Sequence, residues 1–304
     1  MQLYHYTFEA MGTPCELQFY AASKAKIQAK KIAKCIINDV QRLEQCYSRY
    51  RSDSVLSKIN RIAATGGRVQ VDTETSALLD YAATCYLQSE GLFDITSGVL
   101  RQIWQTKQLQ LPTQQQIAAI LKNIGWQRIH WQSPWLEFPE QGLELDFGGI
   151  VKEYAVDRSA ILLQESGIEH GYINLGGDIR VIGPHYNGQP WLIGIQHPRK
   201  PEKLLQTIEL YNGALASSGD YQRCLIIEGQ RYGHVFNPKS AWPVNYLAAV
   251  SVISDLCVVA GSAASIAMLK ENEGIDWLDS LGLPCLWVDV HGGLGGKLLT
   301  TKQK

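Results

Sequence analysis

The sequence has no long hydrophobic run, and this absence excludes the class of proteins built around membrane-spanning helices. No stretch approaches the ~20 consecutive apolar residues that a helix needs to cross a bilayer. Residues 1–17 also lack the basic segment followed by an apolar one that marks a secretory signal peptide. We therefore expect a protein without a signal peptide and without a membrane partner.

An excess of charge of either sign is also missing. The 28 lysines and arginines nearly balance the 29 aspartates and glutamates, so the net charge is −1. Proteins that bind nucleic acid or anionic membranes usually carry a clear basic excess, so we expect neither partner. Hydrophobic residues make up 45% of the chain and charged residues 19%, which is typical of a globular protein.

The seven cysteines include no Cys-x-x-Cys pair, which argues against a zinc site. Their odd number and scattered positions argue against a disulfide framework, so we expect reduced thiols and a cytoplasmic protein. No Gly-x-Gly-x-x-Gly segment follows a predicted strand, which makes a Rossmann-type dehydrogenase a distant alternative.

The most informative pattern lies in residues 143–183. Apolar and acidic residues alternate over 143–147, which predicts a half-buried strand. Gly148 and Gly149 break this strand, and apolar residues at helical spacing predict a helix over 150–164 that ends at Gly167. Two further strands, 172–175 and 179–182, follow, with a Gly176-Gly177 turn between them.

The turn between the predicted strand and helix indicates a binding site for an anion. The first N–H groups of a helix have no acceptor within it, and two glycines let a ligand approach them closely. Lys152 adds a positive charge in the first turn, and Asp146 is placed to accept hydrogen bonds from the ligand. In the alternative interpretation, the glycines only form a loop and Lys152 is a solvated surface residue.

Elsewhere, hydrophobic periodicity predicts further helices and strands. The length of 304 residues allows about two domains, but no Pro- or Ser-rich linker divides the chain. We therefore expect a single domain over 1–304 with two interleaved lobes.

Helices are predicted at 22–46, 76–89 and 258–271. A short helix is predicted to begin at a cap, Asp53 or Ser54, and to end near Asn60. Another short helix is predicted after a cap at Thr113, within a glutamine-rich surface insertion over 105–125. Strands are predicted at 4–8, 15–19, 131–138, 191–196, 205–210, 224–228, 247–254 and 286–290, the last paired with 297–300, whereas 213–223 is expected to be a turn.

Seven segments, in register over nearly the whole chain, resemble the ApbE family of FAD:protein FMN transferases. They are Met11-Gly12-Thr13, SRYRSDSVLSKIN (48–60), FDITSG (93–98), LDFGGIVKEYAVD (145–157), INLGGDIRVIG (173–183), ASSGDYQR (216–223) and GHVFNP (233–238). The resemblance implies an α+β fold of mixed sheets flanked by helices, with FAD held between two lobes.

The resemblance also implies roles for individual residues. Met11 corresponds to a methionine that packs on the flavin, and His234 is the catalytic residue in a segment that borders the FAD diphosphate and isoalloxazine. In the alternative interpretation, Met11 and Tyr50 belong to the core and His234 is an ordinary turn residue. The positions implied to contact FAD are Met11, Tyr50, Leu92, Phe93, Asp94, Asp146, Lys152, His234 and Phe236.

The reaction implied is transfer of FMN from FAD to a serine or threonine hydroxyl of a target protein, with release of AMP. Such transfers depend on positioning and on charge neutralisation, normally by Mg²⁺. The family's magnesium ligands correspond here to Gly149 and to an Ala-Asp-x-x-x-Thr pattern on the last long helix. In this chain the aspartate position is Gly261 and the threonine position is Ser265, and the aspartate of a family Asp-Pro pair is Asn237.

The missing carboxylate at position 261 leaves two functions open, because Mg²⁺ usually takes at least one carboxylate ligand. The first is a flavin transferase whose metal site is weakened or rebuilt with another carboxylate, such as Asp178 or Asp220. The second is an FAD-binding homologue without transferase activity, which stores, carries or senses flavin.

Overall fold

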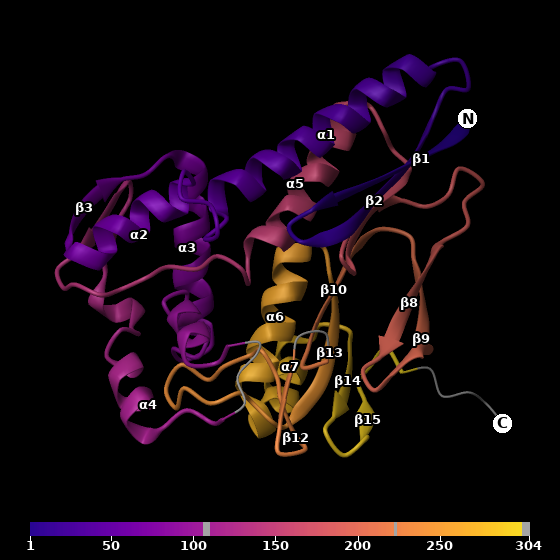
Figure 1. Ribbon diagram of the computed structural model, residues 1–304. Coiled ribbons are helices and arrows are strands. Elements are labelled where there is room, and N and C mark those ends of the chain that lie inside the picture. Colours follow the sequence, from indigo (N-terminus) through magenta and orange to yellow (C-terminus); the bar gives the residue numbers. More distant parts are fainter. Residues whose placement is uncertain (106–109, 222–223, 300–304) are drawn as a thin grey trace.

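The computed structural model describes residues 1–105, 110–221 and 224–299, and an eight-stranded sheet forms its centre (Figure 1). Every strand pairing within these residues is antiparallel. The α+β class expected from the sequence is confirmed. The sheet order is β1 (Gln2–Ala10), β2 (Thr13–Ala21), β6 (Gly171–Leu175), β7 (Asp178–Gly183), β10 (Gly213–Gly219), β13 (Leu247–Ser254), β14 (Cys285–Asp289) and β15 (Leu294–Gly295).

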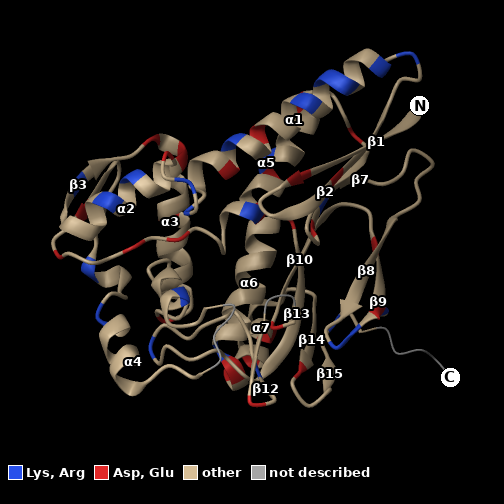
Figure 2. Ribbon diagram, viewed as in Figure 1, with Lys and Arg blue, Asp and Glu red and all other residues tan. Residues whose placement is uncertain are grey.

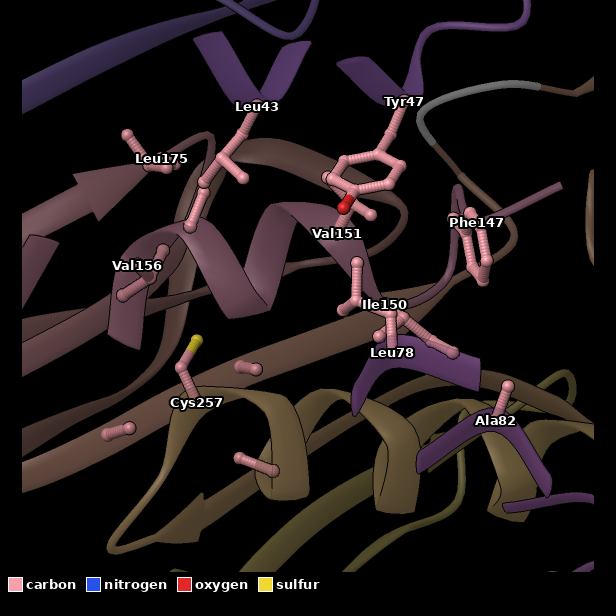
Figure 3. Packing of buried hydrophobic residues seen from close by; sticks show 14 of the residues in the cluster. Leu43, Tyr47, Leu78, Ala82, Phe147, Ile150, Val151, Val156, Leu175 and Cys257 are labelled. Carbon is pink, nitrogen blue, oxygen red and sulfur yellow. The ribbon is translucent and has the colours of Figure 1, made fainter. Parts of the chain in front are cut away.

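Helices α1 (Lys26–Tyr47), α5 (Val151–Glu165) and α6 (Cys257–Leu269) cover one face of the central sheet. Figure 3 shows Leu43 and Tyr47 of α1 facing α5, with Cys257 of α6 on the far side of α5. The Tyr47 and Phe147 rings meet edge to face, 5.7 Å apart. This shared core fixes the start of α5, because Phe147 lies immediately before the Gly148-Gly149 turn.

A hairpin of β8 (Trp191–His197) and β9 (Lys200–Leu210) covers the opposite face of the sheet. Its alternate side chains Trp191, Ile193 and Ile195 pack with residues of β6 and β7 in a second apolar cluster. Strands β6 and β7 are therefore covered on both faces, which explains why their apolar residues run almost without interruption.

The remaining elements surround this three-layer arrangement, and Figure 1 shows α2, α3, β3 and α4 grouped on the left.

Within the described residues, no helix is long and apolar enough to cross a bilayer. Basic and acidic residues intermingle over the elements in Figure 2. The division into two interleaved lobes stays a prediction. The remaining elements are α2 (Val55–Thr65), β3 (Gly67–Gln70), α3 (Thr73–Gln88), η1 (Ser97–Gln102), α4 (Gln114–Leu121), η2 (Trp126–Arg128), β4 (His130–Gln132), β5 (Trp135–Phe138), β11 (Leu225–Ile227), β12 (Gln230–Tyr232), η3 (Glu271–Glu273) and α7 (Gly274–Leu281).

The predicted helices are confirmed, and the structure decides their caps. Ser54, rather than Asp53, caps α2 by accepting a hydrogen bond from Ser57 N, and the helix continues past Asn60 to Thr65. Thr113 caps α4 in a reciprocal capping box with Gln116.

The strand predicted over 143–147 is wrong, although buried residues do alternate with half-buried ones as predicted. Asn60 of α2 takes the place of a neighbouring strand. Its Oδ1 accepts from Leu145 N (2.8 Å), and its Nδ2 donates to the Leu145 carbonyl (2.9 Å). A side chain that satisfies the backbone in this way leaves an extended segment outside any ladder.

Three other predictions need correction. Residues 131–138 form two strands, β4 and β5, because Ser133-Pro134 makes a turn between them. Residues 213–219, expected as a turn, form strand β10 at the centre of the sheet, where small residues let α6 pack closely against it. Strand β14 pairs with Leu294–Gly295 instead of 297–300, because Asp289 accepts two turn N–H groups and tightens the turn. Positions 222–223 and 300 of these predicted segments lie outside the described residues.

Candidate functional site

All the site residues predicted from the sequence line one large cleft. Its volume of about 1780 Å³ exceeds the ~300–1,000 Å³ of ordinary small-molecule pockets, so it has room for an extended dinucleotide. The walls come from the β1–β2 hairpin, the end of α1, the start of α5 and the central sheet. The predicted residues that line the cleft are Met11, Tyr50, Leu92, Phe93, Asp94, Asp146, Gly149, Lys152, His234, Phe236 and Ser265.

Met11 lies at the tip of the β1–β2 hairpin. Ala10 pairs with Thr13, so Met11 and Gly12 alone form the turn, with φ of 54° and 70°. Two positive φ angles define a type I′ turn, in which a residue with a long side chain is strained. Met11 N donates to Glu44 Oε1 (2.7 Å), which anchors the turn to α1. Backbone strain at a residue that lines the cleft is typical of a functional position.

We predict that Met11→Gly separates stability from ligand affinity. Glycine adopts a positive φ without strain, and this gain offsets the packing that the methionine side chain provides. The free energy of unfolding should therefore change by less than about 1 kcal/mol. FAD affinity, followed by flavin fluorescence, should fall by about tenfold, since an apolar contact on the flavin contributes about 1–2 kcal/mol. Unchanged affinity would remove Met11 from the binding surface.

Tyr50 is 80% exposed, so the alternative interpretation of Tyr50 as a core residue is wrong. The Arg49 guanidinium lies 5.1 Å from the centre of the Tyr50 ring and donates to its hydroxyl (3.0 Å). Arg49 also forms an ion pair with Asp146. Burial lowers the pKa of Arg49, but Asp146, Tyr50 and Glu144 together outweigh this effect and leave the pKa raised. Sequence reasoning missed Arg49, although it lies within the quoted 48–60 segment.

The loop before η1 is held by Asp94. Its two carboxylate oxygens accept hydrogen bonds from Thr96 N (2.8 Å), Thr96 Oγ1 (2.7 Å) and Trp126 N (3.0 Å). Burial raises the pKa of Asp94 despite these donors. Asp94 therefore shapes the wall of the cleft, and its contact with FAD stays a prediction. The neighbouring Phe93 packs against Gly149, where an added Cβ would lie 3.2 Å from the ring.

At the turn that begins α5, some of the backbone N–H groups already donate to acceptors within the protein, which the sequence did not predict. Gly148 N donates to Asp146 Oδ1 (2.9 Å), and Val151 N donates to the Phe147 carbonyl (3.0 Å). Within the described residues, the backbone ladder gives the Gly149 carbonyl no donor. Gly149 is exposed and lines the cleft, which leaves its backbone groups accessible to a ligand.

Lys152 is not a freely solvated surface residue. Its Nζ lies 2.5 Å from Oδ2 of the buried Asp178, which follows the Gly176-Gly177 turn. Burial lowers the pKa of Lys152, but Asp178 and then Glu153 outweigh this effect, so the pKa is raised and the ammonium stays charged. The pair joins α5 to the β6–β7 hairpin in the wall of the cleft.

His234 and Phe236 lie on the loop that follows β12. His234 is exposed and lines the cleft. Phe236 stacks on Trp104, with ring centres 5.9 Å apart, and Trp104 Nε1 donates to the Ala241 carbonyl (2.8 Å). This aromatic packing fixes the loop that carries His234.

Oxygen donors suited to a hard cation lie in the same cleft. Ser265 lines it one turn after Gly261, together with the Gly149 carbonyl and the buried Glu153, which sequence reasoning missed. No group of three or more His, Cys, Asp or Glu side chains in metal-binding positions occurs in the described ranges. Asp178 and Asp220, the two carboxylates expected as substitutes, are engaged by Lys152 and by Arg199 (2.5 and 2.7 Å).

Asp157 of α5 fixes the start of α6, the helix that carries Gly261 and Ser265. Its carboxylate accepts hydrogen bonds from Cys257 N and Val258 N, each at 2.9 Å, and pairs with Arg180 (2.8 Å). Helix α6 has no side-chain cap of its own at Leu256. Asp157 therefore acts as a cap supplied by another helix.

Known proteins resemble this chain in sequence and in structure. The ApbE family model matches residues 11–287. The FAD:protein FMN transferase of Vibrio cholerae serotype O1 is 28% identical over 291 residues, which cover 93% of this chain and 86% of the relative. The Escherichia coli K12 protein of the same name is 29% identical over 265 residues, which cover 81% and 72%.

Solved structures match over almost the full chain. The ApbE protein from Thermotoga maritima MSB8 has a TM-score of 0.87 and 28% identity, with 97% of both chains covered. The flavin transferase ApbE from Vibrio cholerae has a TM-score of 0.85 and 26% identity, with 97% and 96% covered. The match to the family model includes all the residues that line the cleft, and we conclude that this chain belongs to the ApbE family.

Proposed function

We propose that this protein transfers FMN from FAD to a serine or threonine hydroxyl of a target protein and releases AMP. The observation that carries this proposal is the convergence of eleven predicted site residues on one cleft in an ApbE-family chain. Relatives named FAD:protein FMN transferase support the assignment of both the substrate and the reaction.

In the proposed step, the acceptor oxygen forms a new bond to the FMN phosphorus. The bond between this phosphorus and the oxygen that bridges to AMP breaks, and AMP leaves with the electron pair. We assign to Lys152, which pairs with Asp178, the binding of the negative diphosphate, and to Met11 the packing on the flavin; both residues line the cleft. We assign to His234 the acceptance of the proton that the hydroxyl loses.

Magnesium fits this cleft as the cation of the reaction. The Gly149 carbonyl, the Ser265 hydroxyl and the Glu153 carboxylate are oxygen donors, and the Oε2 atom of Glu153 is buried without a hydrogen-bond partner in the described residues. When bound, Mg²⁺ would neutralise charge on the diphosphate.

Release of AMP tests the proposal against an FAD-binding protein without transferase activity. The purified protein is incubated with FAD, Mg²⁺ and a panel of threonine- and serine-containing peptides, and AMP is measured by chromatography. The transferase should form AMP in amounts equal to the flavin attached to peptide. FAD that binds tightly but is recovered intact across the panel would favour a carrier, store or sensor.

We further infer that the protein works in the cytoplasm. All seven cysteines are free in the structure, and Cys15, Cys85, Cys257 and Cys285 are buried. Burial raises the pKa of Cys257 and Cys285, which makes these thiols slow to react. Labelling of denatured, non-reduced protein should therefore detect seven thiols, whereas a count lower by two or more would indicate disulfides.

A further inference from the structure

Among the oxygen donors in the cleft, Glu153 is the one that the sequence did not predict, and it is a buried carboxylate. It follows Lys152 on α5, is 8% exposed and lines the cleft. Its Oε2 atom finds no hydrogen-bond partner among the described residues. A buried acidic oxygen without a partner destabilises the fold, so its presence points to a ligand that is bound there.

The side chain of Glu153 occupies the space that a larger residue at position 261 would need. A Cβ atom placed on Gly261 would lie 2.6 Å from Cγ of Glu153 and 3.1 Å from its Cδ and Oε1 atoms. Because carbon atoms that are not bonded pack at about 3.5–4.0 Å, an aspartate at 261 would force the Glu153 side chain out of its present position. The Glu153 carboxyl group therefore lies beside the position that an aspartate at 261 would use.

Lys152 attracts the neighbouring Glu153 carboxylate, but less strongly than Asp178 repels it. Lys152 is paired with Asp178, whose carboxylate repels Glu153. A divalent cation in contact with Glu153 would favour its ionised form.

We propose that Glu153 supplies the magnesium-binding carboxylate that position 261 lacks, together with the Ser265 hydroxyl and the Gly149 carbonyl. The proposal rests on the proposed FMN transfer, in which the cation neutralises the diphosphate. All three residues line the same cleft, and one carboxylate with two neutral oxygens suits Mg²⁺ when phosphate oxygens and waters complete its coordination. The ligand has moved from α6 to α5, and glycine at 261 makes room for it.

Mn²⁺ binding in the presence of FAD tests this assignment without a measurement of activity. Free Mn²⁺ is followed by electron paramagnetic resonance, and FAD binding is measured separately by flavin fluorescence in the presence of a chelator. Glu153→Gln keeps the shape of the side chain and removes its charge. It should weaken Mn²⁺ binding by about 10- to 100-fold, while the exposed Glu165→Gln on the same helix leaves it unchanged.

Exchanging the two positions gives a second test. Gly261→Asp alone places a side chain against Glu153, so it should lower the melting temperature and fail to strengthen Mn²⁺ binding. The pair Glu153→Ala and Gly261→Asp returns the carboxylate to α6 with room to fit. This double variant should recover Mn²⁺ affinity to within about threefold of the original protein, since the number of charged ligands is restored.

The outcomes separate this inference from the proposed function. FAD binding with equal Mn²⁺ affinity in Glu153→Gln and the original protein would overturn the role of Glu153. The same result would arise if Glu153 acted only as a proton acceptor. Failure of every variant, and of the original protein, to bind FAD would instead contradict the proposed function.

Discussion

Asp157→Ala lowers the free energy of unfolding by about 3–5 kcal/mol in our account, because it breaks a buried ion pair and leaves Arg180 uncompensated. The Cys257 and Val258 N–H groups at the start of α6 also lose their acceptor. Loss of a helix cap contributes about 1 kcal/mol of this effect. Urea denaturation followed by circular dichroism measures the change.

Two further variants define the origin of this loss. Asp157→Asn keeps one acceptor oxygen and most of the side-chain shape, so it should destabilise the fold by less than Asp157→Ala. Glu165→Ala, at an exposed position on the same helix, should change stability by no more than about 0.5 kcal/mol. A loss below about 1 kcal/mol for Asp157→Ala would show that α6 does not depend on this cap.

Lys152→Met slows AMP formation by about 10²- to 10³-fold, as expected when a charge that stabilises the transition state is removed. The same change leaves the buried Asp178 without its ion-pair partner, so stability should also fall by about 3–5 kcal/mol. Rates measured at low temperature, where the variant stays folded, separate the two effects.

The double variant Lys152→Met and Asp178→Asn is the matched control. With both charges removed, no unpaired carboxylate stays buried at position 178. The asparagine also retains the oxygen that accepts from Ser217 N (3.3 Å). Most of the lost stability should return while AMP formation stays slow. A double variant with the original rate would show that Lys152 serves only the fold.

The sequence predicted the elements whose pattern reflects local periodicity. Helix α1 repeats apolar residues along one face, and the 171–183 hairpin has glycines at the two turn positions with φ of 63° and 97°. The alternation over 143–147 also predicted burial correctly. The same alternation wrongly predicted a strand, because the Leu145 backbone bonds to the Asn60 side chain instead of to a neighbouring strand. A contact of this kind leaves no periodic pattern in the sequence.

Residues that act through distant partners were harder to predict. Strand β10 consists largely of small residues, which resemble a turn until α6 is seen packed against them. Arg49 pairs with Asp146 across 97 positions of the chain. Glu153 became informative only when the structure placed it beside Gly261, because neither residue alone indicates a metal site.

The most direct test of the proposed function is a single-turnover experiment with FAD and the peptide panel in the presence of Mg²⁺. Mass spectrometry of the peptides and chromatography of the nucleotides follow both halves of FAD in the same sample. Our account predicts a threonine or serine that carries FMN through a phosphoester, with one AMP released for each FMN attached. FAD that stays bound and intact, with no peptide modified, would contradict it.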